Sequence, residues 1–288
     1  MNRPIPKVES PLGLVAGGGG LPRQVAKACL ESGRALFVVR LKGFADPEMA
    51  EYPGMDAGLG EFGKVFSALK REGCSSVCFA GAVKRPDFSA LKPDLRGLTA
   101  MPGLMAAARR GDDAVLRRVL WEFEREGFDI EGVHSAVQGI TMSEGVMGTV
   151  RPEARHAEDI TRALQVARGI GELDIGQGAV VADGLVLAVE AQEGTDAMLA
   201  RVAGLPSEIR GSAEMRIGVL AKAPKPIQDR RVDLPTIGVT TVHNVATAGL
   251  SGIVGEAGAV LVVDRAEVIE EANRLGLFIY GSPPTSRR

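Results

Sequence analysis

The stretch from Lys222 to Asp233 carries the residue types that phosphoryl chemistry needs. It reads KAPKPIQDRRVD, in which lysines and arginines accompany the carboxylates of Asp229 and Asp233. Lysine and arginine neutralise phosphate oxygens, and a carboxylate can hold Mg²⁺ or orient a water molecule. Its prolines stiffen the backbone and lower the entropy cost of holding side chains in one geometry. A charged loop is usually just solvated, so both interpretations are open at this point.

Two glycine-rich turns are further candidates for phosphate binding. The run GGGG at 17–20 separates an expected buried strand from an expected helix, where backbone N–H groups and the helix dipole attract anions. Gly81 follows another expected strand, and open α/β sheets bind ligands at the carboxyl ends of their strands. Neither the dinucleotide fingerprint nor a P-loop lysine is present. The alternative for the first segment is a tight turn without a ligand, and for the second it is a surface loop with solvated cations.

A third group of polar residues lies in LDIGQGAVVADGLVLAVEAQEGTD, at 173–196. Glu190 follows an apolar run, and a carboxylate in such a place is often functional because its burial is costly. Thr195 and Asp196 either belong to a site or form an N-cap pair for the next helix. The three histidines show no zinc spacing, and no G-x-S-x-G elbow is present.

Composition limits the class of protein that holds these residues. The chain has 288 residues, 45% of them hydrophobic and 24% charged, and a formal net charge of −2. A substantial core can form, and a general nucleic-acid partner is not expected. No apolar run reaches the length of a membrane span, and three cysteines fit a reducing compartment. We therefore expect a cytoplasmic protein.

The first half alternates short apolar runs with helical patterns. The segments 12–16 and 35–41 are expected strands, and SSVCFAGAV (75–83) is an expected strand that runs into a glycine turn. KVFSALKREG (64–73) and DDAVLRRVLWEFEREG (112–127) are expected helices. Strands that alternate with helices predict a parallel sheet with right-handed crossovers. We therefore predict an α/β fold whose N-terminal domain, residues 1–138, is Rossmann-like.

The second half predicts a mixed α/β domain at 154–288, after a linker at 139–153. The segment 157–171 has helical spacing, and GAVVADGLVLAVEA (178–191) predicts a hairpin through its Asp-Gly turn. After the charged loop, TIGVTTV and AVLVVD are expected strands, followed by a helix from Arg265 to Leu275.

Several of these stretches together resemble the LpxI-type UDP-2,3-diacylglucosamine pyrophosphatases. They are AGGGGLP near the start, LDIGQGAVV with VLAVEAQEGTD, and KPIQDRRVDLPTIG followed by AGLSGIVGEAG. The resemblance runs in order from Leu12 to about Gly281. It implies a Mg²⁺-dependent enzyme of lipid A biosynthesis in a Gram-negative bacterium, with two domains that hold the substrate between them. It also implies that water attacks the sugar-side phosphorus, so that the products are UMP and 2,3-diacylglucosamine 1-phosphate (lipid X).

Residue roles carried over from the family fall on the charged loop and its surroundings. The essential aspartate of RVDLPTIG corresponds to Asp233, as a Mg²⁺ ligand or as the group that orients water, and Asp229 is the second choice. The candidate substrate contacts are Gly17, Gly18, Gly19, Gly81, Gln177, Thr195, Asp196, Lys222, Lys225 and Gln228. The diacyl substrate implies transient, peripheral contact with the inner membrane, and a homodimer is left open.

Two other functions compete with this interpretation. A dinucleotide-dependent oxidoreductase would explain the first glycine turn, but its ribose-binding acid after the second strand is missing, since Arg40 stands there. A nucleotide-sugar-binding protein without catalysis is the other rival. Release of UMP from the substrate would exclude binding without turnover.

Overall fold

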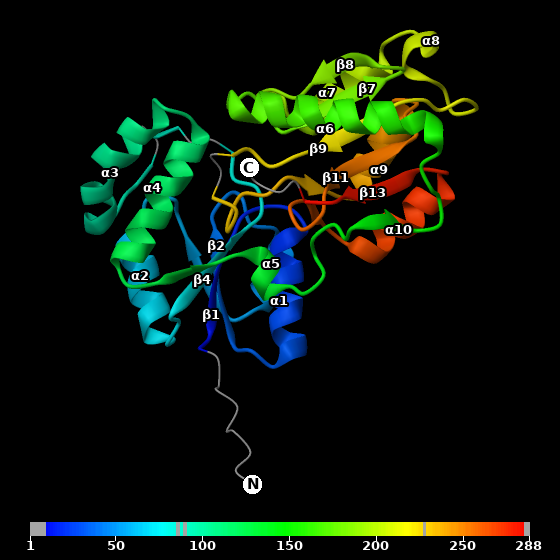
Figure 1. Cartoon of the computed structure of the whole chain (residues 1–288). Coiled ribbons are helices and arrows are strands. Elements are labelled where there is room, and N and C mark those ends of the chain that lie inside the picture. The colour runs from blue at the N-terminus through cyan, green and yellow to red at the C-terminus, as the bar shows by residue number, and fades with distance from the viewer. Residues whose placement is uncertain (1–9, 85–86, 89–90, 227–228, 285–288) are drawn as a thin grey trace. The chain divides into compact units, whose positions relative to one another are not determined.

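The structure is a computed structural model, and it describes residues 10–84, 87–88, 91–226 and 229–284. The chain forms two compact units, Met1–Gln138 and Gly139–Arg288. Each is an α/β unit with its own sheet, as Figure 1 shows by colour along the chain. The predicted fold class, a parallel-sheet N-terminal domain followed by a mixed α/β domain, is confirmed. No helix within the described ranges is both long and apolar enough to cross a bilayer.

The first unit is built on a five-stranded, wholly parallel sheet of order β3-β2-β1-β4-β5. This order is the one found in the first part of doubly wound nucleotide-binding sheets. Its elements are β1 (Leu12–Ala16), α1 (Leu21–Ser32), β2 (Leu36–Leu41), η1 (Pro47–Glu51), β3 (Gly54–Ala57), α2 (Phe62–Arg71), β4 (Ser76–Ala80), α3 (Leu95–Ala108), α4 (Asp112–Arg125), β5 (Asp129–Glu131) and α5 (Val133–Ala136).

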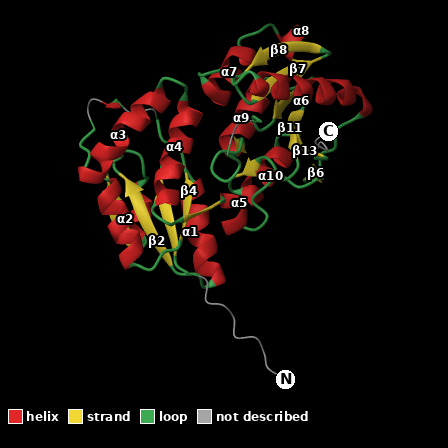
Figure 2. Ribbon diagram, turned by 60° about the vertical axis from the view of Figure 1, so that its left-hand side comes forward, coloured by secondary structure: helices red, strands yellow, loops and turns green. Residues whose placement is uncertain are grey.

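Helices cover both faces of this sheet, with α1 and α5 on one side and α2 and α4 on the other (Figures 1 and 2). Strand β1 is buried along its whole length because it lies in the middle of the sheet between covered faces. Phenylalanines pack edge to face between α2, α4 and β4, with centroids 4.9 Å apart for Phe66 and Phe123 and 5.0 Å for Phe79 and Phe123.

The second unit has a six-stranded mixed sheet of order β6-β13-β11-β9-β7-β8. Strands β9, β11 and β13 are parallel, and the antiparallel strands β6, β7 and β8 complete its edges. The elements are β6 (Gly145–Met147), η3 (Ala154–His156), α6 (Ala157–Glu172), β7 (Gly178–Ala182), β8 (Leu185–Val189), α7 (Gly194–Ala203), α8 (Ser207–Arg210), β9 (Val219–Lys222), β10 (Thr236–Ile237), α9 (Val239–Thr247), β11 (Gly252–Glu256), β12 (Leu261–Val262), α10 (Arg265–Arg274) and β13 (Phe278–Ser282).

Alternation along the strands divides the core of this unit between the two faces of its sheet. Val219 and Ala221 of β9 pack with the buried alanines of α6 on one face. Leu220, between them, joins the larger cluster under α7, α9 and α10 on the other face. Strand β9 is therefore fully buried, and the residue at its end, Lys222, enters the interior with it.

Two sequence expectations differ from the structure of this unit. The expected linker at 139–153 contributes β6, which pairs antiparallel with β13 at the sheet edge. TIGVTTV forms only the two-residue strand β10 and then begins α9. Its β-branched residues favour a strand, but Val242 and Val245 are three residues apart and both are buried, so packing imposes the helical period.

The predicted hairpin through Asp183-Gly184 is confirmed, since β7 pairs antiparallel with β8. Both turn residues have positive φ, 47° and 76°, as a type I′ turn requires. The buried carboxylate of Asp159 on α6 accepts hydrogen bonds from both turn N–H groups, at 3.0 and 2.7 Å. The turn is thereby fixed to the helix that covers the sheet.

Candidate active site

Lys222, the last residue of β9, is a buried cation at the centre of the polar cluster. Only 2% of it is exposed. Its Nζ donates to Thr195 Oγ1 at 2.5 Å and lies 3.3 Å from Glu190 Oε2. Burial lowers the pKa of Lys222, and the negative charges of Glu190, Asp196 and Asp233 oppose that shift. The lysine therefore lies in the field of three carboxylates, two of which are predicted site residues.

Glu190 directly follows β8 and is itself buried. Its Oε1 accepts a hydrogen bond from the Thr195 hydroxyl at 3.0 Å, so threonine, glutamate and lysine form one connected group. Its Oε2 is in ion-pair contact with Lys222 but accepts no well-aligned hydrogen bond from any described residue. A buried carboxylate oxygen with one ion-pair contact retains capacity for another positive partner.

The glycines of LDIGQGAVV make room for Glu190. A Cβ on Gly178 would overlap Glu190 Oε2, and one on Gly176 would overlap the Glu190 carbonyl oxygen. The Glu190 N–H donates to the Gly178 carbonyl at 2.8 Å, which holds the two segments together. Between the glycines, the Gln177 carbonyl accepts from Ala223 N–H at 2.9 Å, so this motif also fixes the residue that follows Lys222.

Thr195 and Asp196 lie in the first turn of α7, and neither side chain caps the helix. Thr195 contacts the cluster, whereas Asp196 is exposed. The N-cap position belongs to Glu193, and no side chain caps there. Asp196 Oδ1 accepts a hydrogen bond at 2.9 Å from the Asn244 side chain on α9. Asn244 is a site neighbour that the sequence analysis does not identify, because nothing in its local pattern distinguishes it from any helix asparagine.

The two aspartates of the charged loop, Asp229 and Asp233, differ in the interactions that they make. Asp229 pairs with Arg231 through Nε at 2.9 Å and Nη2 at 2.6 Å, and its carbonyl accepts from Val232 N–H and Asp233 N–H, both at 3.0 Å. These contacts form a compact local turn. Asp233 instead acts electrostatically on Lys222. Asp229 is therefore a turn-forming residue.

Two other loop residues were predicted to contact substrate. Lys225 Nζ pairs with Asp174 Oδ1 at 2.9 Å, which ties the start of the loop to the segment after α6. Gln228 lies outside the described residues. The cations nearest to Asp233 along the chain, Arg230 and Arg231, follow that gap.

The glycine turn of the first unit uses its own N–H groups internally. Gly17 N–H donates to Ala80 O at 2.8 Å, and Gly18 N–H donates to Ala82 O at 2.9 Å. Gly19 N–H donates to the Asp46 carboxylate at 2.9 Å. A ligand at this turn would therefore not accept hydrogen bonds from these three N–H groups. It would contact other atoms of the turn, or pack closely against the glycine backbone.

Close packing explains why these positions are glycine. A Cβ on Gly17 would lie 2.7 Å from Ala82 O, and one on Gly18 would lie 2.9 Å from Phe44 O. Gly81 has φ 91°, a conformation that favours glycine, and its Cβ would lie 2.7 Å from Gly18 O. The turn after β1 and the turn after β4 are therefore packed backbone to backbone.

The metal-binding potential of the second unit rests on few ligands. No group of three or more histidine, cysteine, aspartate or glutamate side chains suited to a metal occurs in the part of the chain that the structure describes. Mg²⁺ commonly binds through one or two carboxylates together with substrate phosphates.

Family comparisons match both units. Residues 11–140 match the LpxI N-terminal domain, and residues 143–280 match the LpxI C-terminal domain. The UDP-2,3-diacylglucosamine pyrophosphatase LpxI of Caulobacter vibrioides is 64% identical over 276 residues, which cover 96% of this chain and 99% of that protein. The chain belongs to the LpxI family. The predicted family is thus confirmed, and the hydrolase class predicted for the chain agrees with that relative's name.

Solved structures resemble this LpxI-family chain only weakly. CobK precorrin-6A reductase has 16% identity and a TM-score of 0.32, covering 96% of this chain and 90% of its own. The UDP-glucose 4-epimerase of Thermus thermophilus, in complex with NAD, has 13% identity and a TM-score of 0.28. That match covers 96% of this chain and 87% of the epimerase.

Proposed function

We propose that this chain hydrolyses the pyrophosphate bond of UDP-2,3-diacylglucosamine to UMP and 2,3-diacylglucosamine 1-phosphate, with Mg²⁺, in lipid A biosynthesis. The observation that carries the proposal is the buried Lys222 between Glu190 and Thr195, in the field of Asp196 and Asp233. The substrate comes from the name of the relative that is 64% identical. We propose the cytoplasm as the place of this reaction.

Charge balance supports a divalent cation in this reaction. Glu190, Asp196 and Asp233 act on one ammonium group, so the cluster has two more negative than positive charges when all four groups are ionised. A pyrophosphate adds further negative charge, which such a cluster would repel. Glu190 Oε2 also accepts no hydrogen bond from the described residues. Asp233 and Asp196 would hold Mg²⁺ together with phosphate oxygens, and the ion would neutralise charge on the transferring phosphoryl group.

The protein side chains have distinct roles in the proposed reaction. Lys222 neutralises a phosphate oxygen, and its burial strengthens that interaction because water does not screen it. Glu190 and Thr195 hold the ammonium group in position. Asp233 accepts a hydrogen bond from the attacking water and orients it toward the sugar-side phosphorus. The bond from that phosphorus to the bridging oxygen breaks, and UMP leaves with the oxygen.

The predicted contacts of Gly17, Gly18, Gly19 and Gly81 with the nucleotide belong to this proposal as well. The two turns lie at the carboxyl ends of β1 and β4, where parallel sheets bind nucleotides. Because the N–H groups of the first three glycines donate within the chain, we assign these turns to the uridine or ribose rather than to the phosphates. Gln177 acts through its carbonyl, as a support for the residue after Lys222.

Incubation of the purified chain with UDP-2,3-diacylglucosamine and Mg²⁺ tests the proposal directly. We expect UMP release that requires the divalent ion and stops with chelator. Reaction in ¹⁸O-labelled water should place the label in the sugar phosphate and leave UMP unlabelled. Binding of substrate by folded protein without UMP release would establish a binding protein instead. Label in UMP would refute attack at the sugar-side phosphorus.

A further inference from the structure

Helix α3 of the first unit has an apolar face toward solvent as well as one toward the core. Gly97, Ala100, Leu104 and Ala108 form the buried face. Leu95, Leu98 and Met105 are 84%, 55% and 51% exposed, and Pro102 is exposed between them. Positions 95, 98, 102 and 105 are spaced by three or four residues, so they form one stripe along the helix. Single exposed apolar residues are ordinary, but a continuous stripe of them indicates an interaction surface.

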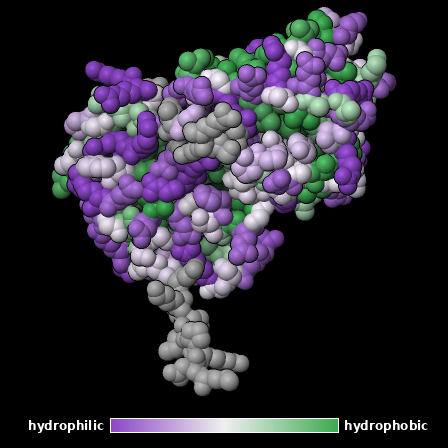
Figure 3. Space-filling model, viewed as in Figure 1, coloured by the Kyte–Doolittle hydropathy of each residue, from purple (hydrophilic) through white to green (hydrophobic). Residues whose placement is uncertain are grey.

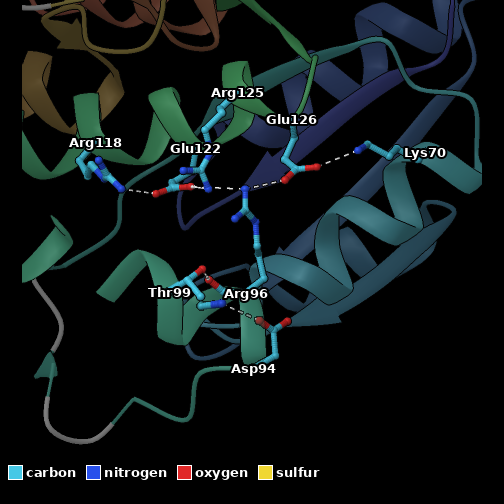
Figure 4. Close-up of polar contacts among 9 residues, drawn as sticks. Lys70, Asp94, Arg96, Thr99, Arg118, Glu122, Arg125 and Glu126 are labelled. Carbon is cyan, nitrogen blue, oxygen red and sulfur yellow. Dashed lines mark hydrogen bonds and ion pairs between the residues drawn. The ribbon is translucent and has the colours of Figure 1, made fainter. Parts of the chain in front are cut away.

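Polar contacts join the start of α3 to the neighbouring helices (Figure 4). The Asp94 carboxylate caps the helix by accepting from Gly97 N–H at 2.8 Å. Arg96 pairs with Glu126 at 2.6 Å, and Glu126 also pairs with Lys70 of α2 at 2.8 Å. The buried Glu122 of α4 pairs with Arg118 and, at 3.0 Å, with Arg125. The helix is thus docked by one side only.

Cations border the stripe at both ends. Lys92 precedes α3, and Arg109 and Arg110 directly follow its last turn, while residues 95–110 contain no acidic side chain. None of these three cations forms an ion pair with a residue in the described ranges. An apolar stripe with unpaired cations at its ends is the pattern by which a helix lies in the interface of an anionic bilayer.

The neighbouring helix adds an aromatic residue of interfacial character. Trp121 on α4 is 42% exposed, and the guanidinium groups of Arg118 and Arg125 lie over its ring, at 4.2 and 4.6 Å from the centroid. Tryptophan is enriched where protein meets lipid headgroups, and arginine is common on the polar face of helices that lie there. In Figure 3, the left-hand edge of this unit, where Figure 1 places α3, shows hydrophobic patches among hydrophilic surface.

We propose that the exposed face of α3 is the surface by which this chain docks on an anionic lipid bilayer. The inference deepens the proposed function and rests on it, since a substrate with two acyl chains resides in a membrane. A second copy of the chain fits less well, because pairing two such faces would bring like-charged arginines together, whereas anionic headgroups oppose them.

The test compares two double variants that add the same charge. Leu98→Glu with Met105→Glu alters the stripe. Leu173→Glu with Met215→Glu alters two residues of the second unit that are 72% and 70% exposed. Co-sedimentation with phosphatidylglycerol–phosphatidylethanolamine vesicles is measured for both and for the unaltered chain. We expect the stripe variant to lose binding by about tenfold or more and the control to retain it.

Activity is measured with two forms of the substrate. One form has long acyl chains and is embedded in vesicles, and the other has acyl chains short enough to be water-soluble. The stripe variant should hydrolyse the vesicle-embedded form more slowly and the short-chain form at the unaltered rate. If neither form is hydrolysed by the unaltered chain while vesicle binding persists, the proposed reaction fails and the docking surface stands.

Three results would overturn the docking surface. One is binding of the unaltered chain to anionic vesicles no stronger than to phosphatidylcholine vesicles. Another is equal vesicle binding by the stripe and control variants. The third is a change of the stripe variant from dimer to monomer by light scattering with vesicle binding unchanged, which would make the stripe an interface between copies. Should the stripe variant fail to fold, Arg109→Ser with Arg110→Ser, beyond the last turn of α3, must weaken binding and its dependence on salt.

Discussion

Replacing Glu190 by glutamine should destabilise the second unit, because it removes the contacting negative charge from a buried cation. Lys222 Nζ lies 3.3 Å from Glu190 Oε2, and the two residues are 2% and 6% exposed. The other carboxylates in the field of Lys222 belong to Asp196 and Asp233, which act on the ammonium through their charge. The amide of glutamine keeps the volume and can still accept from Thr195, so the change isolates the charge.

The expected loss follows from the cost of an uncompensated buried charge. Removing one partner of a buried ion pair costs about 3–5 kcal/mol of unfolding free energy. Because the hydrogen bond to Thr195 is retained, we expect Glu190→Gln to lose about 3 kcal/mol. For a unit of about 150 residues, each kcal/mol lowers Tm by about 2–4 °C, so the second unit should melt about 6–12 °C lower. Glu48→Gln is the matched control, since its pair with Arg23 is exposed and contributes at most ~1 kcal/mol.

Thermal and urea unfolding of five chains measures this effect: unaltered, Glu48→Gln, Glu190→Gln, Lys222→Met and the Glu190→Gln/Lys222→Met double variant. Each single change in the buried pair leaves one buried charge without its contact partner, whereas the double change removes both. The double variant should therefore be more stable than the sum of the single losses predicts, by about 1.5 kcal/mol or more. The reasoning is refuted if Glu190→Gln has the same melting temperature as the Glu48→Gln control. It is also refuted if the stability lost by the double variant equals the sum of the losses of the two single variants.

Three further predictions concern the site and the thiols. Asp233→Ala should lower turnover by about two orders of magnitude or more with folding intact. Asp229→Ala should mainly reduce stability, because it opens the local turn. Steady-state UMP release and melting curves measure both effects, and the reverse pattern would exchange the roles of the two aspartates. Gly178→Ala should lower turnover as well, because its Cβ displaces the Glu190 carboxylate. The control for loss of a glycine is Gly258→Ala, where no atom lies within 4 Å of the added Cβ. Equal turnover by these two variants would contradict the packing argument. Burial raises the pKa of Cys74 to about 11 and of Cys78 to about 12. A thiol reagent at about pH 8 should therefore label both cysteines slowly until the chain is unfolded. Rapid labelling of the folded chain would contradict this prediction.

Local chemistry made parts of the fold predictable from sequence. The Asp183-Gly184 turn needs positive φ at both residues, and few dipeptides tolerate this, so the hairpin was identifiable. Helix α3 was missed because apolar residues lie on both its faces and Pro102 interrupts it, which leaves no amphipathic period to detect. In α9, the buried spacing of Val242 and Val245 outweighed the strand preference of β-branched residues.

The site was partly predictable for a related reason. The residue types of the charged loop indicated phosphate chemistry, and the family resemblance selected Asp233. The pairing of Lys222 with Glu190 could not be foreseen, because it joins the ends of two strands that are separated by β7 in the sheet. Asn244 had no local signal at all. That the N–H groups at 17–19 bond within the chain was equally hidden, since their acceptors are distant carbonyls and the carboxylate of Asp46.

The loop between Lys222 and Asp233 is tied at both ends to the sheets of the second unit. Ala223 N–H donates to the Gln177 carbonyl at its start, and Leu261 N–H donates to the Pro235 carbonyl just after Asp233. Doubling the length of a loop with fixed ends costs only about 0.6 kcal/mol. Relatives with insertions in this segment that leave the turn at 229–233 intact should therefore fold normally, and selection against them would come from the chemistry of Asp233. Length variation in the loop would consequently mark lineages in which this step has been lost or replaced.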